Sequence, residues 1–135
     1  MAKISRFEDL EIWQIAKVIA VEAYRLSDIE PIKSDWGLKD QFRRAALSMS
    51  DNIAEGFEYN NNPDFIRFLR YSKGSSGEFR NKLIILQAAG KIDQDKYQLR
   101  YDASTDFSAK TKKLIDYLIK FERNKQTGKA KPSNL

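Results

Sequence analysis

Residues 38–56, LKDQFRRAALSMSDNIAEG, carry the pattern that decides the fold. Apolar or small residues recur there at steps of three or four, which places them on one face of an α-helix. These residues are Leu38, Phe42, Ala45, Met49, Ile53 and Gly56. Ser34 and Asp35 are both good N-cap types, so the sequence predicts a helix from about Ser34 or Asp35 to Tyr59.

The same spacing recurs on both sides of this segment. A first helix is expected from about Glu8 to Leu26, ending before Pro31 because proline disfavours helical geometry in the preceding residue. A third is expected to start with Asn62 as cap and Pro63 at the first helical position, and to end at Gly90. Their stripes are Ile12, Ala16, Ile19, Ala23 and Leu26, and Phe65, Leu69, Ser72, Ser76, Phe79, Leu83 and Leu86.

A fourth helix is expected from Asp93 or Asp95 to about Arg123. Its second half has clear apolar spacing, whereas residues 102–106, DASTD, are polar and predict a kink. Residues 124–135 are polar and basic with no core residues, which predicts a disordered tail. The expected domain is therefore a bundle over residues 1–123, followed by that tail.

Four helices of about 20–30 residues with short links predict an all-α protein, an up-down-up-down antiparallel four-helix bundle. The 135 residues are enough for one domain with a continuous core. With 6 Gly and 3 Pro, the chain has too little turn chemistry for a many-stranded sandwich or barrel.

The composition also limits the chemistry. The absence of cysteine excludes disulfides, thiolate zinc sites and cysteine nucleophiles, and the absence of histidine removes the usual general base. No catalytic residue, metal site or cofactor is expected. The N-terminal stretch has no secretory signal pattern and no segment predicts a membrane span, so we expect a cytoplasmic protein.

A polar stripe borders the apolar one in the second helix, and the third helix has small residues around Gly74 and Gly77. Two mid-helix glycines cost about 1 kcal/mol each against alanine, which predicts a close approach by the second helix or by another subunit. We expect a buried hydrogen-bond network that specifies the bundle or the oligomer; the alternative is a small-ligand or phosphate pocket. The predicted members are Gln41, Arg44, Ser48, Asn52, Glu55, Ser72 and Ser76.

Positive charge gathers in the second half of the chain. Residues 1–66 have a net charge of −4 and residues 67–135 a net charge of +9. Lysine and arginine on a helix face neutralise phosphates without sequence preference, although such a face is also typical of plain solvated surface. Tyr71, beside this cluster, is suited either to stack on a base or to pack on a neighbouring subunit. The predicted nucleic-acid contacts are Arg67, Arg70, Lys73, Arg80, Lys110 and Lys113.

Two other classes of function stay open. Glu55 and Glu58 form an E-x-x-E pair like those of Mg²⁺-dependent nucleotide hydrolases, which need a second acidic pair, here Glu78 or Asp102 with Asp106. A protein-binding adaptor for a larger enzyme would use interface aromatic residues instead. The aromatic residues suited to that role are Trp13, Trp36, Phe57 and Tyr59.

Three blocks resemble the four-helix bundle family named for 23S ribosomal RNA intervening-sequence proteins. They are residues 7–14 with Ala16; residues 38–48 with Asn52–Gly56; and Phe65, Phe68, Leu69, Gly74, Ser75 and Glu78. The resemblance implies a small bacterial protein of a family with no established enzymatic activity. It also implies a homopentamer, similar to reverse-transcriptase accessory proteins of diversity-generating retroelements, and association with RNA.

The chain departs from the family pattern at several positions. Ser50 replaces a common proline, which predicts a less kinked second helix, and residues 57–59 replace a small-polar and basic stretch. Gly77 and Phe79-Arg80 also differ from the usual pattern. The resemblance and the basic helix faces together predict a homo-oligomeric protein that binds RNA or a ribonucleoprotein.

Overall fold

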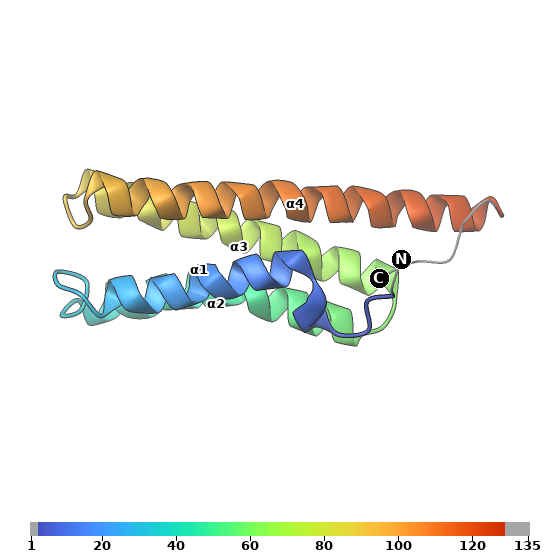
Figure 1. Cartoon of the computed structure of the whole chain (residues 1–135), viewed down its shortest axis with the longest axis horizontal. Helices are drawn as coiled ribbons and strands as arrows, with labels where there is room; N and C mark the ends of the chain where they lie inside the picture. The colour runs from blue at the N-terminus through green and yellow to red at the C-terminus, as the bar shows by residue number, and fades with distance from the viewer. Residues whose placement is uncertain (1–2, 129–135) are drawn as a thin grey trace.

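Four long helices run alternately up and down in the computed structural model, which describes residues 3–128 (Figure 1). No strand occurs within those residues. The predicted all-α, up-down-up-down four-helix bundle is therefore confirmed. A short 3-10 turn, η1 (Phe7–Asp9), precedes α1 (Glu11–Ser27), α2 (Trp36–Glu58), α3 (Asn62–Ala88) and α4 (Gln94–Gln126).

Side-chain caps fix the start of three helices. The carboxylate of Asp35 accepts a hydrogen bond from the Leu38 amide at the start of α2. Asn61, and not the expected Asn62, caps α3, because its side-chain oxygen accepts from the amide of Asp64. Asp93 caps α4.

The C-terminus of α3 is closed at Gly90, one residue after its C-cap. Gly90 has a φ of +71°, in the left-handed region that glycine adopts without strain. The amide of Lys91 donates to the carbonyl oxygen of Leu86 at 2.8 Å, which satisfies a carbonyl at the end of the helix. The predicted stop is therefore confirmed.

The α2–α3 pair forms the centre of the core. The rings of Phe42 and Phe79 stack with centroids 5.1 Å apart, and both side chains are fully buried. Near the end of α2 the helices approach so closely that a Cβ on Gly56 would lie 2.5 Å from Cβ of Phe68. The α2 helix passes through Ser50 without a break, as the absence of proline there predicts.

The kink predicted at residues 102–106 is wrong, because α4 is one continuous helix. Small hydroxyl residues at 104, 108 and 111 form a buried stripe that continues the apolar spacing. The hydroxyl of Ser104 donates to the carbonyl oxygen of Ser76 at 3.2 Å and fixes α4 against α3. The helix also extends to Gln126, so the first residues of the predicted tail are helical, and residues 129–135 lie outside the described part.

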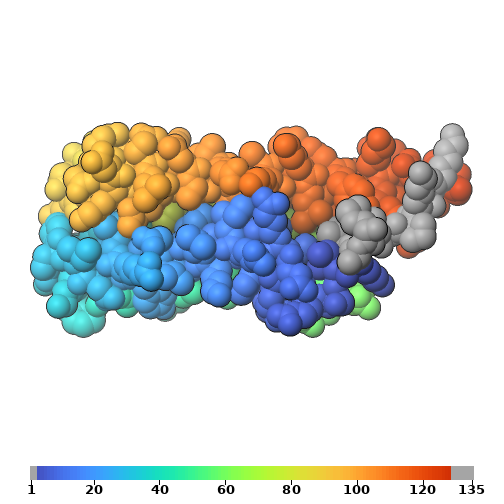
Figure 2. All heavy atoms as spheres, viewed as in Figure 1, coloured from blue at the N-terminus to red at the C-terminus, as the bar shows by residue number. Residues whose placement is uncertain are grey.

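The seam between α1 and α4 closes the bundle and lies along the face seen in Figure 2. Two ion pairs cross it: Glu22 with Arg100 at 3.0 Å, and Glu11 with Lys110 at 2.7 Å. Among residues 3–128, no helix has the length and apolar character needed to cross a lipid bilayer.

Candidate nucleic-acid interface

The first turns of α3 present three cations, and the first of them is held by its neighbours. The guanidinium of Arg67 lies 3.1 Å from the carboxylate of Asp64 and 4.6 Å from the ring centroid of Phe68. Hydrogen bonding to the Tyr71 side chain, and then to Asp64, raises the pKa of Arg67 above its usual value. Arg67 is therefore fixed in place with its charge partly compensated.

Arg70 and Lys73 follow on the same helix and are not compensated in this way. Arg70 is exposed and Lys73 is half-buried. Within residues 3–128, no carboxylate lies within ion-pair distance of either cation. Both charges are thus available to an anion from outside the chain, which a phosphate-binding face requires.

Arg80 does not lie with these cations, although the sequence groups it with them. Its guanidinium is turned toward α4 and donates to the carbonyl oxygen and the hydroxyl of Ser104, each at 3.2 Å. It also donates to the hydroxyl of Ser76 at 3.3 Å. The structure therefore assigns Arg80 to the α3–α4 contact, because the long side chain can reach back toward the core.

The two predicted lysines of α4 differ from one another. Lys110 pairs with Glu11 at 2.7 Å and with Asp106 at 3.2 Å, and hydrogen bonds to these carboxylates, first Glu11, raise its pKa. Lys113 is exposed and lines a shallow groove between the start of α1 and α4. Of the two, only Lys113 offers an uncompensated charge, so α4 contributes less to a basic surface than its sequence predicts.

An aromatic cluster that the sequence does not group together lies beside Arg67 of α3. The ring of Tyr59 stacks on Phe68 with centroids 5.2 Å apart and an angle of 18° between the planes. Tyr71 meets the same ring edge-on at 5.6 Å. Phe68 is buried, while Tyr59 and Tyr71 are 50% and 51% exposed. The i, i+3 spacing of Phe68 and Tyr71 could have linked these two, but Tyr59 joins them only through the turn after α2.

The residues predicted to form one polar network make separate hydrogen bonds within the chain and are not connected into a single network. Ser72 donates to the carbonyl oxygen of Met49 at 2.6 Å, which is a buried α2–α3 contact. Asn52 donates to the carbonyl oxygen of Ser48 within α2. The α2 stripe faces outward: Gln41, Arg44 and Glu55 are exposed, and Ser48 and Asn52 are half-buried. Ser76 belongs with Arg80 and Ser104.

The two glycines of α3 are not in close contact with α2. A Cβ at Gly74 would meet nothing within 4 Å, and one at Gly77 would meet only the end of the Arg80 side chain at 3.8 Å. The close contact between α2 and α3 that leaves no room for a Cβ lies at Gly56 of α2. The outward faces of Gly74 and Gly77 are open. The close approach that the sequence predicts at these glycines is therefore not made by α2, and an approach by another subunit stays a proposal.

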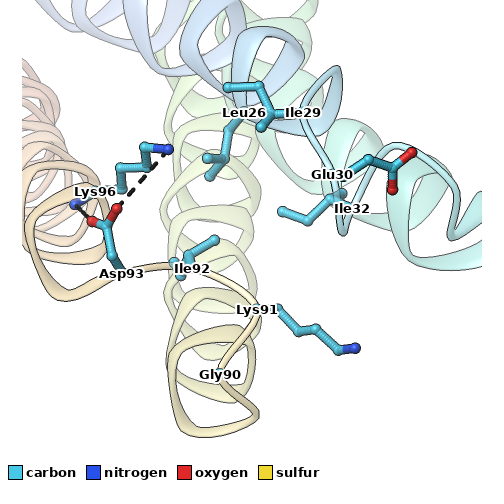
Figure 3. Close-up of a pocket in the computed structure, with 9 residues that line it drawn as sticks. All are labelled: Leu26, Ile29, Glu30, Ile32, Gly90, Lys91, Ile92, Asp93 and Lys96. Carbon is cyan, nitrogen blue, oxygen red and sulfur yellow. Dashed lines mark hydrogen bonds and ion pairs between the residues drawn. The ribbon is translucent and has the colours of Figure 1, made fainter.

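The pockets described for residues 3–128 lie away from the predicted polar stripe. One of about 280 Å³ lies at the end of the bundle where the α1–α2 and α3–α4 loops meet (Figure 3). Its apolar wall is formed by Leu26, Ile32 and Ile92, and Asp93 pairs with Lys96 at its edge. An apolar groove of about 360 Å³ runs between α1 and α2, beside Trp13, Ala20, Val21, Tyr24 and Leu47.

The carboxylates that the sequence suggests for a Mg²⁺ site are not gathered into one metal-binding cluster. Glu55 and Glu58 are exposed at the end of α2. Within residues 3–128, no group of three or more acidic side chains is arranged to hold a metal ion. The second acidic pair that a Mg²⁺-dependent hydrolase needs is therefore not brought to this one.

Comparison with known proteins identifies the family of this chain and a solved structure with a similar fold. The family model of the 23S rRNA-intervening sequence protein matches residues 8–114. The fold is similar to a solved structure from Bacteroides thetaiotaomicron, described as a protein of unknown function from the S23 ribosomal protein family. That likeness has a TM-score of 0.70 at 20% identity and covers 77% of this chain and 97% of the other. No curated protein matches the chain.

Proposed function

Because the chain belongs to the 23S rRNA-intervening sequence protein family, we propose that it is a non-enzymatic, oligomeric protein that binds RNA or a ribonucleoprotein. The observation that carries the proposal is the pair Arg70 and Lys73, two cations of one helix with no carboxylate partner in the described chain. Cations without a carboxylate partner contribute most to phosphate binding, because no internal ion pair has to be broken first.

Lys113 and Arg67 add charge with different roles. Lys113 is an exposed cation of α4 that lies beside the start of α1 and not beside the α3 cations. Arg67 is already paired with Asp64, so its contribution to phosphate binding is smaller. We therefore place the main phosphate contacts at Arg70 and Lys73, and secondary ones at Lys113.

The test is binding of a fluorescent structured RNA, measured by anisotropy at about 50 and 200 mM salt. Micromolar binding that weakens steeply with salt is expected for the wild-type protein. The variant Arg70→Glu with Lys73→Glu should lose most of the affinity. The matched control is Lys33→Glu with Lys91→Glu, which makes the same change in net charge at exposed sites in the loops at the far end of the bundle. Equal losses in both variants would refute a local contact, and absence of binding at 50 mM would refute the proposed function.

The oligomer is part of the same proposal. The open faces of Gly74 and Gly77, and the outward polar stripe of α2, support contacts with further copies of the chain. The resemblance to the family makes five copies the expected number. Light scattering on the purified protein should therefore give about five times the chain mass of 15.7 kDa. A mass of one chain would refute this part.

The groove between α1 and α2 favours a second candidate, a protein-binding adaptor for a larger enzyme. It is mostly apolar, and Val21 and Tyr24 at its side are 40% and 41% exposed. Such a contact would depend little on salt and would be lost on Val21→Glu, whereas phosphate contacts depend strongly on salt. Salt dependence therefore separates the two candidates.

A further inference from the structure

We propose that Tyr59 and Tyr71 form a platform on which unpaired bases of the bound RNA stack, with Arg70 and Lys73 holding the adjoining phosphates. This inference rests on the proposed RNA binding and names the form of RNA that the site takes. It concerns single-stranded segments or loops, because bases within an A-form helix are stacked on one another and offer no free face to a side chain.

The geometry of the three rings supports a fixed surface. Phe68 is buried and contacts both tyrosines, one face to face and the other edge-on. One face of Tyr59 is used by Phe68, and half of its surface is still open to solvent. Tyr71 is open to the same degree. The cluster therefore presents two half-exposed aromatic rings anchored on one buried ring.

The backbone at Tyr59 is fixed as well. The side chain of Asn61 donates to the carbonyl oxygen of Tyr59 at 3.2 Å, and the amide of Asn60 donates to the carbonyl oxygen of Phe57 at 3.1 Å. Asn60 has a φ of +59°, a left-handed conformation that asparagine tolerates and that turns the chain sharply into α3. A ring held in this way loses little freedom when a base stacks on it, which favours binding.

The charges define how the RNA would lie. Glu55 and Glu58 are exposed on the last turns of α2 and repel phosphates on that side of the cluster. Arg70 and Lys73 lie on α3, one position before and two positions after Tyr71, so their side chains leave the helix about 100° and 160° away from that of Tyr71. We therefore infer that bases contact the tyrosines while the RNA backbone crosses the outer face of α3, away from α2. Arg67, whose guanidinium lies 4.6 Å from the ring centroid of Phe68, is the cation in contact with the aromatic cluster.

The experiment compares a fluorescent, unstructured 12-nucleotide RNA with a duplex of the same length and strand sequence, on the full-length protein. Wild-type protein should bind the single strand more tightly than the duplex. Tyr71→Ala should weaken single-strand binding by about 5- to 150-fold, the range that alanine substitution gives for one stacked base, and should change duplex binding little. Tyr71→Phe is the matched control, because it keeps the ring and removes only the hydroxyl that contacts Arg67, so stacking should persist in this variant. Tyr59→Ala provides a second, independent loss.

Each other outcome is informative. If Arg70→Glu with Lys73→Glu removes binding while Tyr71→Ala does not, the basic surface stands and the platform is refuted. Equal affinity for single strand and duplex also refutes it, and no binding of either RNA refutes the proposed function itself. Circular dichroism and light scattering check that Tyr71→Ala keeps its fold and its mass; a lower mass would place the ring between subunits and overturn the platform.

Discussion

Alanine at Gly56 and alanine at Gly74 should change stability in opposite directions, although both glycines lie inside long helices. Alanine favours a helix interior over glycine by about 0.5–1 kcal/mol. At Gly74 nothing lies within 4 Å of the added Cβ, so this gain is not offset within the chain. For a chain with no other copy packed on this face, we expect Gly74→Ala to raise the free energy of unfolding by about 0.5–1 kcal/mol, and the melting temperature by about 2–5 °C.

At Gly56 the added methyl group has no space. Its position lies 2.5 Å from Cβ of Phe68, and a Cβ cannot rotate away, so α2 and α3 would have to separate. Overpacking of this kind costs about 1–3 kcal/mol, which exceeds the gain in helix propensity. We expect Gly56→Ala to lower the free energy of unfolding by about 1 kcal/mol, which is the middle of the overpacking range less the middle of the gain in helix propensity.

Urea unfolding, followed by the helical circular dichroism signal, measures both changes. The measurement is made at two protein concentrations, because the stability of an oligomer depends on concentration. A Gly56→Ala protein as stable as the wild type would refute the close approach of α2 and α3. A loss of stability in Gly74→Ala that depends on protein concentration would show that another copy, and not solvent, covers this face.

Three further changes test individual contacts. Ser72→Ala removes a buried hydrogen bond to the carbonyl oxygen of Met49 and should cost about 0.5–1.5 kcal/mol in urea unfolding, because that oxygen keeps its place in the α2 backbone ladder; no change would contradict its structural role. Hydrogen bonding from Asn61 lowers the pKa of Asp64 in the folded protein below its ordinary 3.8. The ionised Asp64 carboxylate therefore stabilises the fold fully above pH 3.8, and this stabilisation is lost as the pH falls through the lowered pKa of the folded state. The difference in melting temperature between wild type and Asp64→Asn should therefore shrink below pH 3.8, and a constant difference would refute this linkage. Asn52→Leu should leave the helical signal unchanged, because Asn52 bonds only within α2; a lower mass in light scattering would place it in a subunit contact, and a loss of helicity would contradict the structure.

Helix existence could be predicted well from periodicity, and the errors have local causes. The apolar spacing of α2 and α3 is regular, and the capping types near Asp35 and at Asp93 indicated where helices begin. The stretch at residues 102–106 looked weak because its buried contact is made by a serine. A hydroxyl counts as polar in a sequence pattern, but Ser104 is fully buried and satisfied by Ser76.

The candidate site was harder to predict than the fold. A helical spacing gives the direction in which a side chain leaves the helix, but not where a long side chain ends. Arg80 and Lys110 illustrate this, since each reaches a partner that lies far away in the sequence. The aromatic cluster was missed for the same reason, because the contact of Tyr59 with Phe68 depends on the turn between α2 and α3.

The order of the helices has a consequence for folding kinetics. Each helix contacts the next one along the chain, which keeps most contacts local and favours fast folding. The α1–α4 seam is the exception, since its Glu22–Arg100 pair joins residues 78 positions apart. Contacts of such long range close a large loop and are expected to form after the rate-limiting step. Added salt, which weakens exposed ion pairs such as Glu11–Lys110, should therefore accelerate unfolding through this seam while leaving the folding rate nearly unchanged.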